Sequence, residues 1–265
     1  MSHPRQLPLL LPALTVLVSV FMLAPIALSV LAGLVNNYSS GLVSGFTFRW
    51  LHEVLDVYGN TITASLLLAL FCVIGTLILG VPCAYAMARS TSRWARLFEQ
   101  LLTLPVAVPG LATALALVLA FGQLQAFRQS FAFILVGHLL FTLPFMVRTV
   151  SAAFRRHELL ALEEAARSLG ANFTQRFMGV LVPAVLPAIV AASLMVFTLS
   201  VGEFNLTWML HTPLTRTLPV GLADSYASMR IEIGSAYTLV FLMVILPVLW
   251  GLQWLGHIIG KHHGT

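Results

Sequence analysis

The sequence predicts an all-α membrane protein whose helices cross the bilayer six times. Of its 265 residues, 59% are apolar and only 9% are charged, and its mean hydropathy is +0.94. A typical soluble domain is about 45–50% apolar and about 25% charged. So few charges cannot cover a water-exposed surface, and a disordered chain needs the opposite composition. The composition therefore excludes a water-soluble enzyme and indicates a polytopic helical bundle.

Six apolar runs are long enough to cross a bilayer. They comprise residues 9–34, 61–87, 101–121, 131–147, 185–206 and 236–255. The first run is too long to be the apolar part of a signal peptide, so it predicts an uncleaved span. Pro105 and Pro109 at the start of the third run predict a kink or an unwound turn there.

The distribution of cations predicts the orientation of the spans. Of the 14 Lys and Arg residues, ten lie in the N-terminus, in loops 89–96 and 148–176, and in the tail, and four lie in the alternate segments. The positive-inside rule therefore places both termini in the cytoplasm. The same distribution accounts for the net charge of +5 without nucleic acid. On the outside, residues 46–55 mix apolar and charged side chains and predict an interfacial segment with Trp50 as its anchor.

The cytoplasmic loop before the fifth span predicts two short helices. Apolar residues recur at helical spacing from Leu159 to Leu169, so one face of the first helix is apolar. Gly170 is a suitable C-terminal cap, and a second helix can begin near Asn172. The apolar face of the first helix needs a partner. The pattern is equally compatible with packing on the chain's own bundle and with docking into another protein.

The same loop resembles the EAA motif of type I ABC importer permeases, the binding-protein-dependent inner-membrane transport components. The match consists of Glu164-Ala165-Ala166, three residues, Gly170, nine residues, Val180, one residue, and Val182-Pro183. The family has isoleucine and leucine at the two valine positions, and both differences keep apolar bulk. The resemblance covers residues 57–256, so residues 1–56 are an additional N-terminal span with its outside segment, and residues 257–265 are a cytoplasmic tail.

This resemblance implies a role for the loop, with its coupling helices at about residues 158–182. The coupling positions would be Glu163, Glu164, Ala165, Ala166, Gly170 and Pro183. Glu164, Ala165 and Ala166 would enter a cleft of a cytoplasmic ATPase dimer, and Gly170 would make the turn between the helices. The resemblance also implies a second permease subunit, an extracytoplasmic solute-binding protein and a location in the bacterial inner membrane.

The chain is not expected to hydrolyse ATP, because it lacks a phosphate-binding loop. Its only lysine, Lys261, follows a glycine pair with the wrong spacing and precedes a histidine instead of serine or threonine. The sequence offers no catalytic constellation, no metal site and no cofactor motif. An intramembrane enzyme would need a polar cluster that is absent from the sequence. A channel or membrane scaffold would leave the long motif match unexplained.

The ionisable residues Glu203 and His138 lie within apolar runs, and only the first is a candidate for the transport pathway. Glu203, near the end of the fifth run, is interpreted as a pathway or gate residue with Asn205 as a weaker neighbour, because acids within a span usually face the bundle interior. The alternative is an interfacial glutamate at the outer end of the span. His138 is interpreted as a histidine that hydrogen-bonds between helices.

The solute is suggested by resemblance alone. The segments Phe46–Trp50, Gly202–Asn205 and Thr217–Gly221 resemble spermidine/putrescine permeases and their 2-aminoethylphosphonate branch. This implies a small amine-bearing or zwitterionic solute, and a paralogous rather than identical second permease. The alternative solutes for the same machinery are iron, thiamine or an oxyanion.

Overall fold

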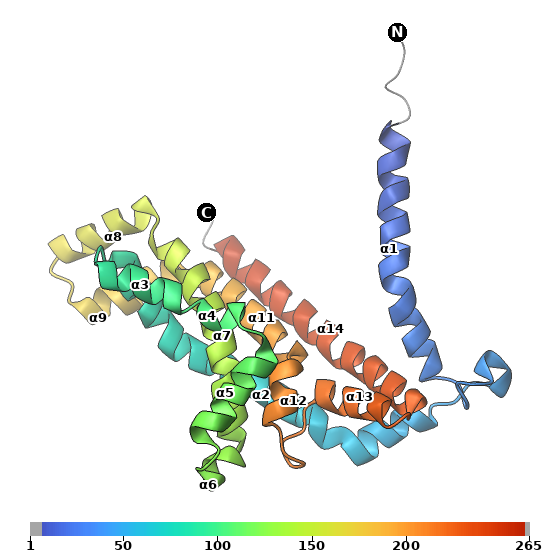
Figure 1. Ribbon diagram of the computed structural model, residues 1–265. Helices are drawn as coiled ribbons and strands as arrows, with labels where there is room; N and C mark the ends of the chain where they lie inside the picture. Colours follow the sequence, from blue (N-terminus) through green and yellow to red (C-terminus); the bar gives the residue numbers. More distant parts are fainter. Residues whose placement is uncertain (1–6, 263–265) are drawn as a thin grey trace. The chain divides into compact units, whose positions relative to one another are not determined.

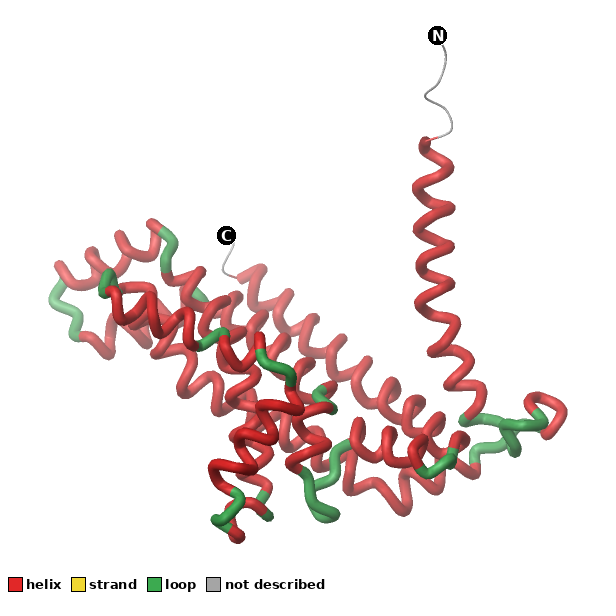
Figure 2. Tube along the Cα trace, in the orientation of Figure 1, coloured by secondary structure: helices red, strands yellow, loops and turns green. Residues whose placement is uncertain are grey.

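The computed structural model describes residues 7–262 and contains helices and connecting loops, with no strand in this range (Figures 1 and 2). The elements, in chain order, are α1 (Leu7–Ala32), η1 (Gly41–Ser44), α2 (Arg49–Arg89), α3 (Arg93–Leu101), α4 (Leu104–Ala107), α5 (Gly110–Phe121), α6 (Gln125–Arg128), α7 (Phe131–Phe154), α8 (His157–Ser168), α9 (Phe173–Arg176), η2 (Phe177–Leu181), α10 (Val182–Ala184), α11 (Leu186–Gly202), α12 (Asn205–Leu210), α13 (Leu218–Ala227) and α14 (Ile231–His262). The all-α prediction is confirmed.

Four helices in the described part of the chain are long and apolar enough to cross a membrane, namely α1, α2, α7 and α14. Two further pairs of helical segments satisfy the same criteria together but are sharply bent. The segments 93–107 and 110–121 meet at 105°, and the segments 173–184 and 186–202 meet at 70°. The helices therefore amount to six spans if each bent pair crosses once.

The two bent pairs correspond to the third and fifth predicted spans. The kink expected near Pro109 is confirmed, because α4 ends before Val108 and α5 begins after Pro109. The fifth span was expected as one run over residues 185–206, and that expectation was wrong. Pro183 and Pro187 flank the bend at Val185 and remove two backbone N–H donors, and the helix ends at Gly202 because Glu203 is extended.

Two other boundaries differ from those expected. Residues 49–55 belong to α2, which runs without interruption into the second span, so they do not form a separate interfacial segment. The side chain of Trp50 donates a hydrogen bond from Nε1 to the carbonyl of Val35 at 2.9 Å. At the other end, α14 continues through residues 257–262 of the expected tail, and residues 263–265 lie outside the described residues.

The chain forms two compact units. The first comprises residues up to 59 together with 221–244, and polar contacts hold it together. Arg230 and Glu53 form an ion pair at 2.6 Å, and Ser29 Oγ lies 3.1 Å from the hydroxyl of Tyr226. The side chains of residues 11–28 in α1 are exposed, as expected of a helix that meets lipid.

The second unit comprises residues 60–220 and the chain from 245 onward, and α7 lies at its centre. Along its length α7 packs against α11, and near its N-terminus it also contacts α5 and α12. The closest approach occurs at Gly137, where a Cβ atom would lie 2.6 Å from Leu206 Cδ2 and 2.7 Å from Leu210 Cδ1. A larger side chain at this position would require the buried side chains of Leu206 and Leu210 to move.

Candidate functional site

The loop that carries the sequence motif folds into two helices joined by a glycine turn, as predicted. Helix α8 ends at Ser168, and Gly170 has a φ of +82°, a conformation that is costly for other residues. The amide of Gly170 donates to the Arg167 carbonyl, and the amide of Ala171 donates to the Ala166 carbonyl. These two bonds form a Schellman cap, so glycine closes α8 and reverses the chain.

The second helix begins with a capping box. The side chain of Asn172 accepts a hydrogen bond from the amide of Gln175, and the Gln175 side chain accepts one from the amide of Asn172, both at 2.9 Å. Helix α9 then continues through the wide turn η2 and through α10, which contains Pro183. The 70° bend at Val185 comes immediately after α10 in the chain. The end of the motif therefore coincides with the entry into α11.

The apolar face of α8 is mostly exposed. Leu159 is buried, but Leu162 is 48% exposed and Leu169 is 89% exposed. The side chains of Glu164 and Ala165 are also exposed, and Ala166 is half-buried. The chain's own bundle thus covers only the start of this face. Of the two partners considered for it, the exposure favours another protein.

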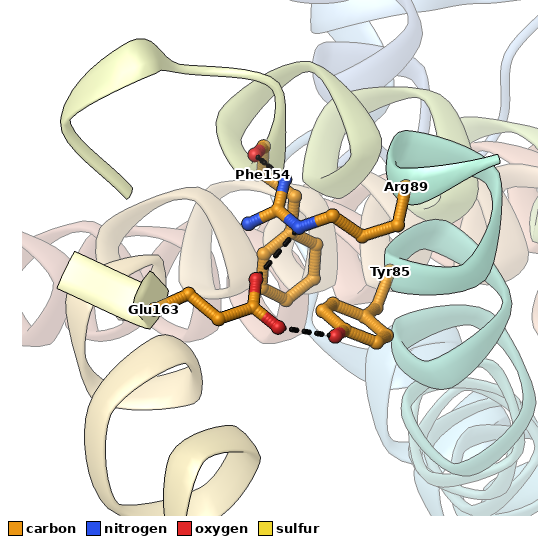
Figure 3. Close-up of polar contacts among 4 residues, drawn as sticks. All are labelled: Tyr85, Arg89, Phe154 and Glu163. Atoms are coloured by element: carbon orange, nitrogen blue, oxygen red, sulfur yellow. Dashed lines mark hydrogen bonds and ion pairs between the residues drawn. The ribbon is translucent and has the colours of Figure 1, made fainter. Parts of the chain in front are cut away.

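Glu163 points inward and ties α8 to the end of α2 (Figure 3). Its carboxylate accepts a hydrogen bond from the Tyr85 hydroxyl at 2.5 Å and forms an ion pair with Arg89 Nε at 2.7 Å. Arg89 also donates from Nη1 to the Phe154 carbonyl at the end of α7, at 2.7 Å. The Glu163 cluster, defined here as Tyr85, Arg89, Phe154 and Glu163, thus joins three helices.

Aromatic packing reinforces the Glu163 cluster. The ring of Tyr85 lies 5.6 Å from that of Phe154, 5.8 Å from that of Phe173 and 5.2 Å from that of Phe177, measured between centroids. Offset and edge-to-face contacts of this kind add to the free energy of burial. Because Phe173 and Phe177 belong to α9 and η2, both halves of the helix pair are fixed to α2.

The electrostatics of the cluster keep Glu163 ionised. Burial raises the pKa of this carboxyl, but hydrogen bonds from Tyr85 and Arg89 and the positive charges of Arg89 and Arg176 outweigh it, so the pKa lies below its ordinary value of 4.5. An open pocket of about 330 Å³ adjoins the cluster. Its lining is Tyr85, Arg89, Leu160, Glu163, Glu164, Arg167 and Arg176.

Glu203 lies at the break between α11 and α12 and is half-buried. Its carboxylate accepts hydrogen bonds from the amides of Leu206 and Thr207 at 3.0 and 3.2 Å, at the start of α12. A carboxylate in this position satisfies amides that lack helical partners and complements the helix dipole. Asn205 is exposed and lies at the first position of α12.

The Glu203 break, between α11 and α12, adjoins the break between α4 and α5. A Cβ atom at Gly110, the first residue of α5, would lie 3.4 Å from Glu203 Oε1 and 3.3 Å from Asn205 Cβ. The interrupted helices thus meet at their interruptions, where an acid, an amide and free helix ends gather. Irregular backbone at membrane depth is tolerated where it is buried in protein or lines a water-filled cavity.

His138 is fully buried and hydrogen-bonds between helices, which confirms its interpretation. Its Nδ1 atom lies 2.9 Å from Ser200 Oγ in α11, and its Nε2 atom lies 2.7 Å from Thr207 Oγ1 in α12. The imidazole of α7 therefore bridges the two sides of the break at Glu203. It holds both helix ends in place through buried hydrogen bonds.

The sequence did not identify the partners of Glu163 and His138. Arg89 was counted only as a charge that flanks a span, and Tyr85 carried no signal of its own. Ser200 and Thr207 are small polar residues in apolar runs, which are typical of helix–helix contacts in membranes. Within the described residues, no group of three His, Cys, Asp or Glu side chains could hold a metal ion.

The sequence is similar to those of several known transport proteins. Residues 76–259 match the family described as "Binding-protein-dependent transport system inner membrane component". PhnV of Salmonella choleraesuis strain SC-B67, named as a proposed 2-aminoethylphosphonate transport system permease, is 28% identical over 251 residues, which cover 91% of this chain and 93% of that protein. The putrescine transport system permease protein PotI of Escherichia coli K12 is 27% identical, over 83% of this chain and 81% of that protein.

Among solved structures, the fold is similar to a chain from a bacterial ABC transporter involved in the import of the acidic polysaccharide alginate. The TM-score is 0.68 at 19% sequence identity, with 100% of both chains covered. At this level of identity the likeness concerns the fold alone.

Proposed function

Since the chain belongs to the family of binding-protein-dependent transport system inner membrane components, it is the permease component of an ABC importer, and we propose that it forms half of a pathway for a small amine-bearing solute. It is an inner membrane transport protein and not an enzyme, because ATP hydrolysis belongs to a separate ATPase subunit. Its role implies two kinds of partner, an ATPase and a solute-binding protein.

The proposed coupling site is the helix pair α8–α9. Glu164, Ala165, Ala166 and Gly170 dock onto a dimer of the ATPase, and Pro183 marks the exit toward α11. The observation that carries this proposal is the division of α8 into an exposed face with Leu162 and Leu169 and an inward carboxylate at Glu163. In this proposal Glu163 fixes the helix to the permease and its neighbours contact the ATPase.

Replacing Gly170 with valine tests the coupling site. A side chain at a φ of +82° costs about 1–2 kcal/mol, which would open the turn. We expect the variant to lose its cognate ATPase on purification, and solute uptake in reconstituted vesicles to fall about tenfold. Gly41 is the matched control, since it has a φ of +56° and, like Gly170, no neighbour that an added Cβ atom would meet.

Gly41→Val should therefore suffer similar backbone strain and keep the ATPase. Undiminished ATPase binding and uptake in Gly170→Val would refute the coupling site. Equal loss in both variants would show that strain alone, and not the position of the turn, is responsible.

The orientation and the second subunit belong to the same proposal. The ten cations in alternate segments support a cytoplasmic position for both termini and for α8–α9. Residues 57–256 form the permease domain, residues 1–56 an added N-terminal part, and residues 257–265 the cytoplasmic end. The second permease subunit is a paralogue, as the resemblance to polyamine permeases implies.

The proposed solute is a polyamine or a 2-aminoethylphosphonate-like compound. The proposal is supported by the names of PhnV and PotI and by an acid at the meeting point of two helix breaks. Calorimetry on the cognate solute-binding protein is the direct test. Either a polyamine (putrescine or spermidine) or 2-aminoethylphosphonate should bind, and iron, thiamine and oxyanions should not. Binding of one of the latter alone would replace the proposed solute without affecting the permease role.

Glu203→Gln tests the proposed pathway role of Glu203, with Asn205 beside it. Glutamine keeps an oxygen that accepts hydrogen bonds from the amides of Leu206 and Thr207 but removes the negative charge. We expect normal assembly with the ATPase and strongly reduced uptake of a cationic solute. Uptake equal to that of the parent protein would refute the pathway role of Glu203, and its function would then be limited to capping α12. Asn205→Ala is the comparison at the same break, because it removes a polar side chain without changing the charge.

A further inference from the structure

Helix α3 is short, strongly amphipathic and absent from the sequence-based expectations. It begins after Ser92, whose side chain caps the amide of Trp94 at 3.2 Å. Its large apolar side chains lie on one side of the helix, and its polar side chains lie on the other. The apolar set is Trp94, Leu97, Phe98 and Leu101, and the polar set is Arg93, Arg96, Glu99 and Gln100.

The contacts of α3 show which face meets the rest of the second unit. Ala95 and Glu99 are its only half-buried residues, and Leu102, which follows the helix, packs against the core. Spaced at i, i+4 and i+7, these three residues form one stripe. Glu99 also forms an ion pair with Arg155 at the end of α7, at 3.0 Å. The stripe thus fixes the rotation of the helix.

The apolar face of α3 lies away from this stripe and is uncovered. Trp94 is 79% exposed, Leu97 43%, Phe98 48% and Leu101 49%. The helix leads through α4 into α5, and residues 93–107 form the first part of a bent pair that satisfies the criteria for crossing a membrane (Figure 1). The exposed face therefore lies at the start of this candidate span.

The charges of α3 indicate the kind of surface that covers this face. Arg93 borders the apolar face and Arg96 lies further round on the polar side, and the single acid of the helix, Glu99, forms an ion pair with Arg155. Arginines that flank an apolar face with a tryptophan are typical of helices that lie in the headgroup region of a membrane with anionic lipids. A protein partner would leave the arginines without an evident counter-charge, whereas lipid phosphates supply one.

We propose that α3 is a membrane-surface helix that inserts Trp94, Leu97, Phe98 and Leu101 among the acyl chains and binds anionic lipid headgroups through Arg93 and Arg96. The cytoplasmic leaflet follows from the proposed orientation of the permease. The insertion itself does not depend on that orientation. By fixing the start of the third span at the membrane surface, α3 sets the depth of the break at Pro109.

The depth of α3 can be measured with spin labels on the full permease, purified with its partner subunits and placed in nanodiscs that contain phosphatidylglycerol. Single cysteines are introduced at Phe98 and Leu101, with Gln100 as the matched control on the polar side. Cys83 is replaced by alanine, and Cys72 is fully buried and does not react. Labels at 98 and 101 should collide more often with oxygen than with a water-soluble nickel complex, and the label at 100 should show the reverse.

Trp94 gives a second measurement without a label. Brominated lipid should quench the fluorescence of the parent protein more strongly than that of Trp94→Phe. Replacing both Arg93 and Arg96 with glutamine should raise nickel access at position 101 in phosphatidylglycerol nanodiscs and leave it unchanged in phosphatidylcholine nanodiscs. This dependence on the anionic lipid is the signature of headgroup binding.

Two results would overturn the proposal. Nickel access at 98 and 101 equal to that at 100, together with no quenching of Trp94, would place the face in water. Alternatively, the labels at 98 and 101 could be protected from both oxygen and nickel, and this protection could disappear when the ATPase or the second permease is removed. That result would identify the face as a protein interface. Neither result bears on the coupling site, which the Gly170 variants test separately.

Discussion

Replacing Glu163 with alanine is expected to reduce solute uptake by about 10- to 100-fold while the permease still binds its ATPase. The substitution leaves Arg89 without its carboxylate in a site where both side chains are less than 20% exposed, which costs roughly 1.5–3 kcal/mol. Helix α8 would keep its exposed docking face but lose its attachment to the end of α2. ATP hydrolysis would then continue without driving transport.

The measurement is a double-mutant cycle with Glu163→Ala, Arg89→Ala and the combined variant, read as uptake per ATP hydrolysed. Because the two side chains act as one unit, the combined variant should be little worse than either single variant. Fully additive losses would contradict the Glu163 cluster as the connection. The ion pair of Glu53 and Arg230 is the matched control, and Glu53→Ala should leave the ratio of uptake to hydrolysis unchanged.

The same cluster predicts a pH dependence of stability. The pKa of Glu163 lies below its ordinary value of 4.5, so its contribution is fully present above about pH 4.5 and is lost as the pH falls through the lowered folded-state value. The difference in melting temperature between the parent protein and Glu163→Gln should therefore be constant near neutral pH. It should shrink under acidic conditions, and a difference that grows on acidification would contradict the prediction.

Replacing His138 with leucine is expected to destabilise the permease by roughly 2–4 kcal/mol and to abolish most uptake. Leucine removes the partner of Ser200 Oγ and of Thr207 Oγ1, which are buried on either side of the break at Glu203. Without the imidazole, α11 and α12 lose their common attachment to α7. Thermal unfolding in nanodiscs, followed with and without the ATPase, measures the loss.

A second histidine provides the control for His138. His211 donates a hydrogen bond from Nδ1 to the Trp208 carbonyl within its own turn, at 2.9 Å, and is not fully buried. His211→Leu should therefore change the melting temperature little. His138→Gln, which can keep one of the two bonds, should fall between the parent protein and His138→Leu. A melting temperature of His138→Leu equal to that of the parent would refute the bridging role.

Local signals in the sequence were sufficient to predict the helix pair. Gly170 and Asn172 act through their own backbone neighbours, so the turn and the capping box could be foreseen from residue type and spacing. The Glu163 cluster could not be predicted in this way, because Tyr85 and Arg89 are separated from Glu163 by 78 and 74 positions in the sequence. Nothing in the pattern of α8 distinguishes an inward glutamate from an outward one until the end of α2 is placed beside it.

The number of apolar runs and the break near Pro109 were predictable from the sequence, but the bend at Val185 and the break at Glu203 were not. Hydropathy averages over residues and therefore detected the run that contains Val185 without detecting the 70° bend. It also assigned α3 to a loop, because three of its nine residues are charged and their clustering on one side is invisible to an average. Glu203 was predicted as a polar residue near a span end, but its bonds to α12 depend on where α11 stops.

The bend at Val185 has a mechanical consequence for the second unit. Residues 173–184 form a short arm and residues 186–202 form a long arm, and the two arms meet at an angle of 70°. A displacement along the axis of the short arm would therefore move the long arm mostly at right angles to its own axis. The long arm is about 26 Å long at 1.5 Å per residue. Near its far end lies Ser200, which forms a hydrogen bond with His138. In the proposed coupling, a displacement that enters at α9 would therefore reach the Glu203 break as a lateral displacement, which is the direction that separates two apposed helix ends.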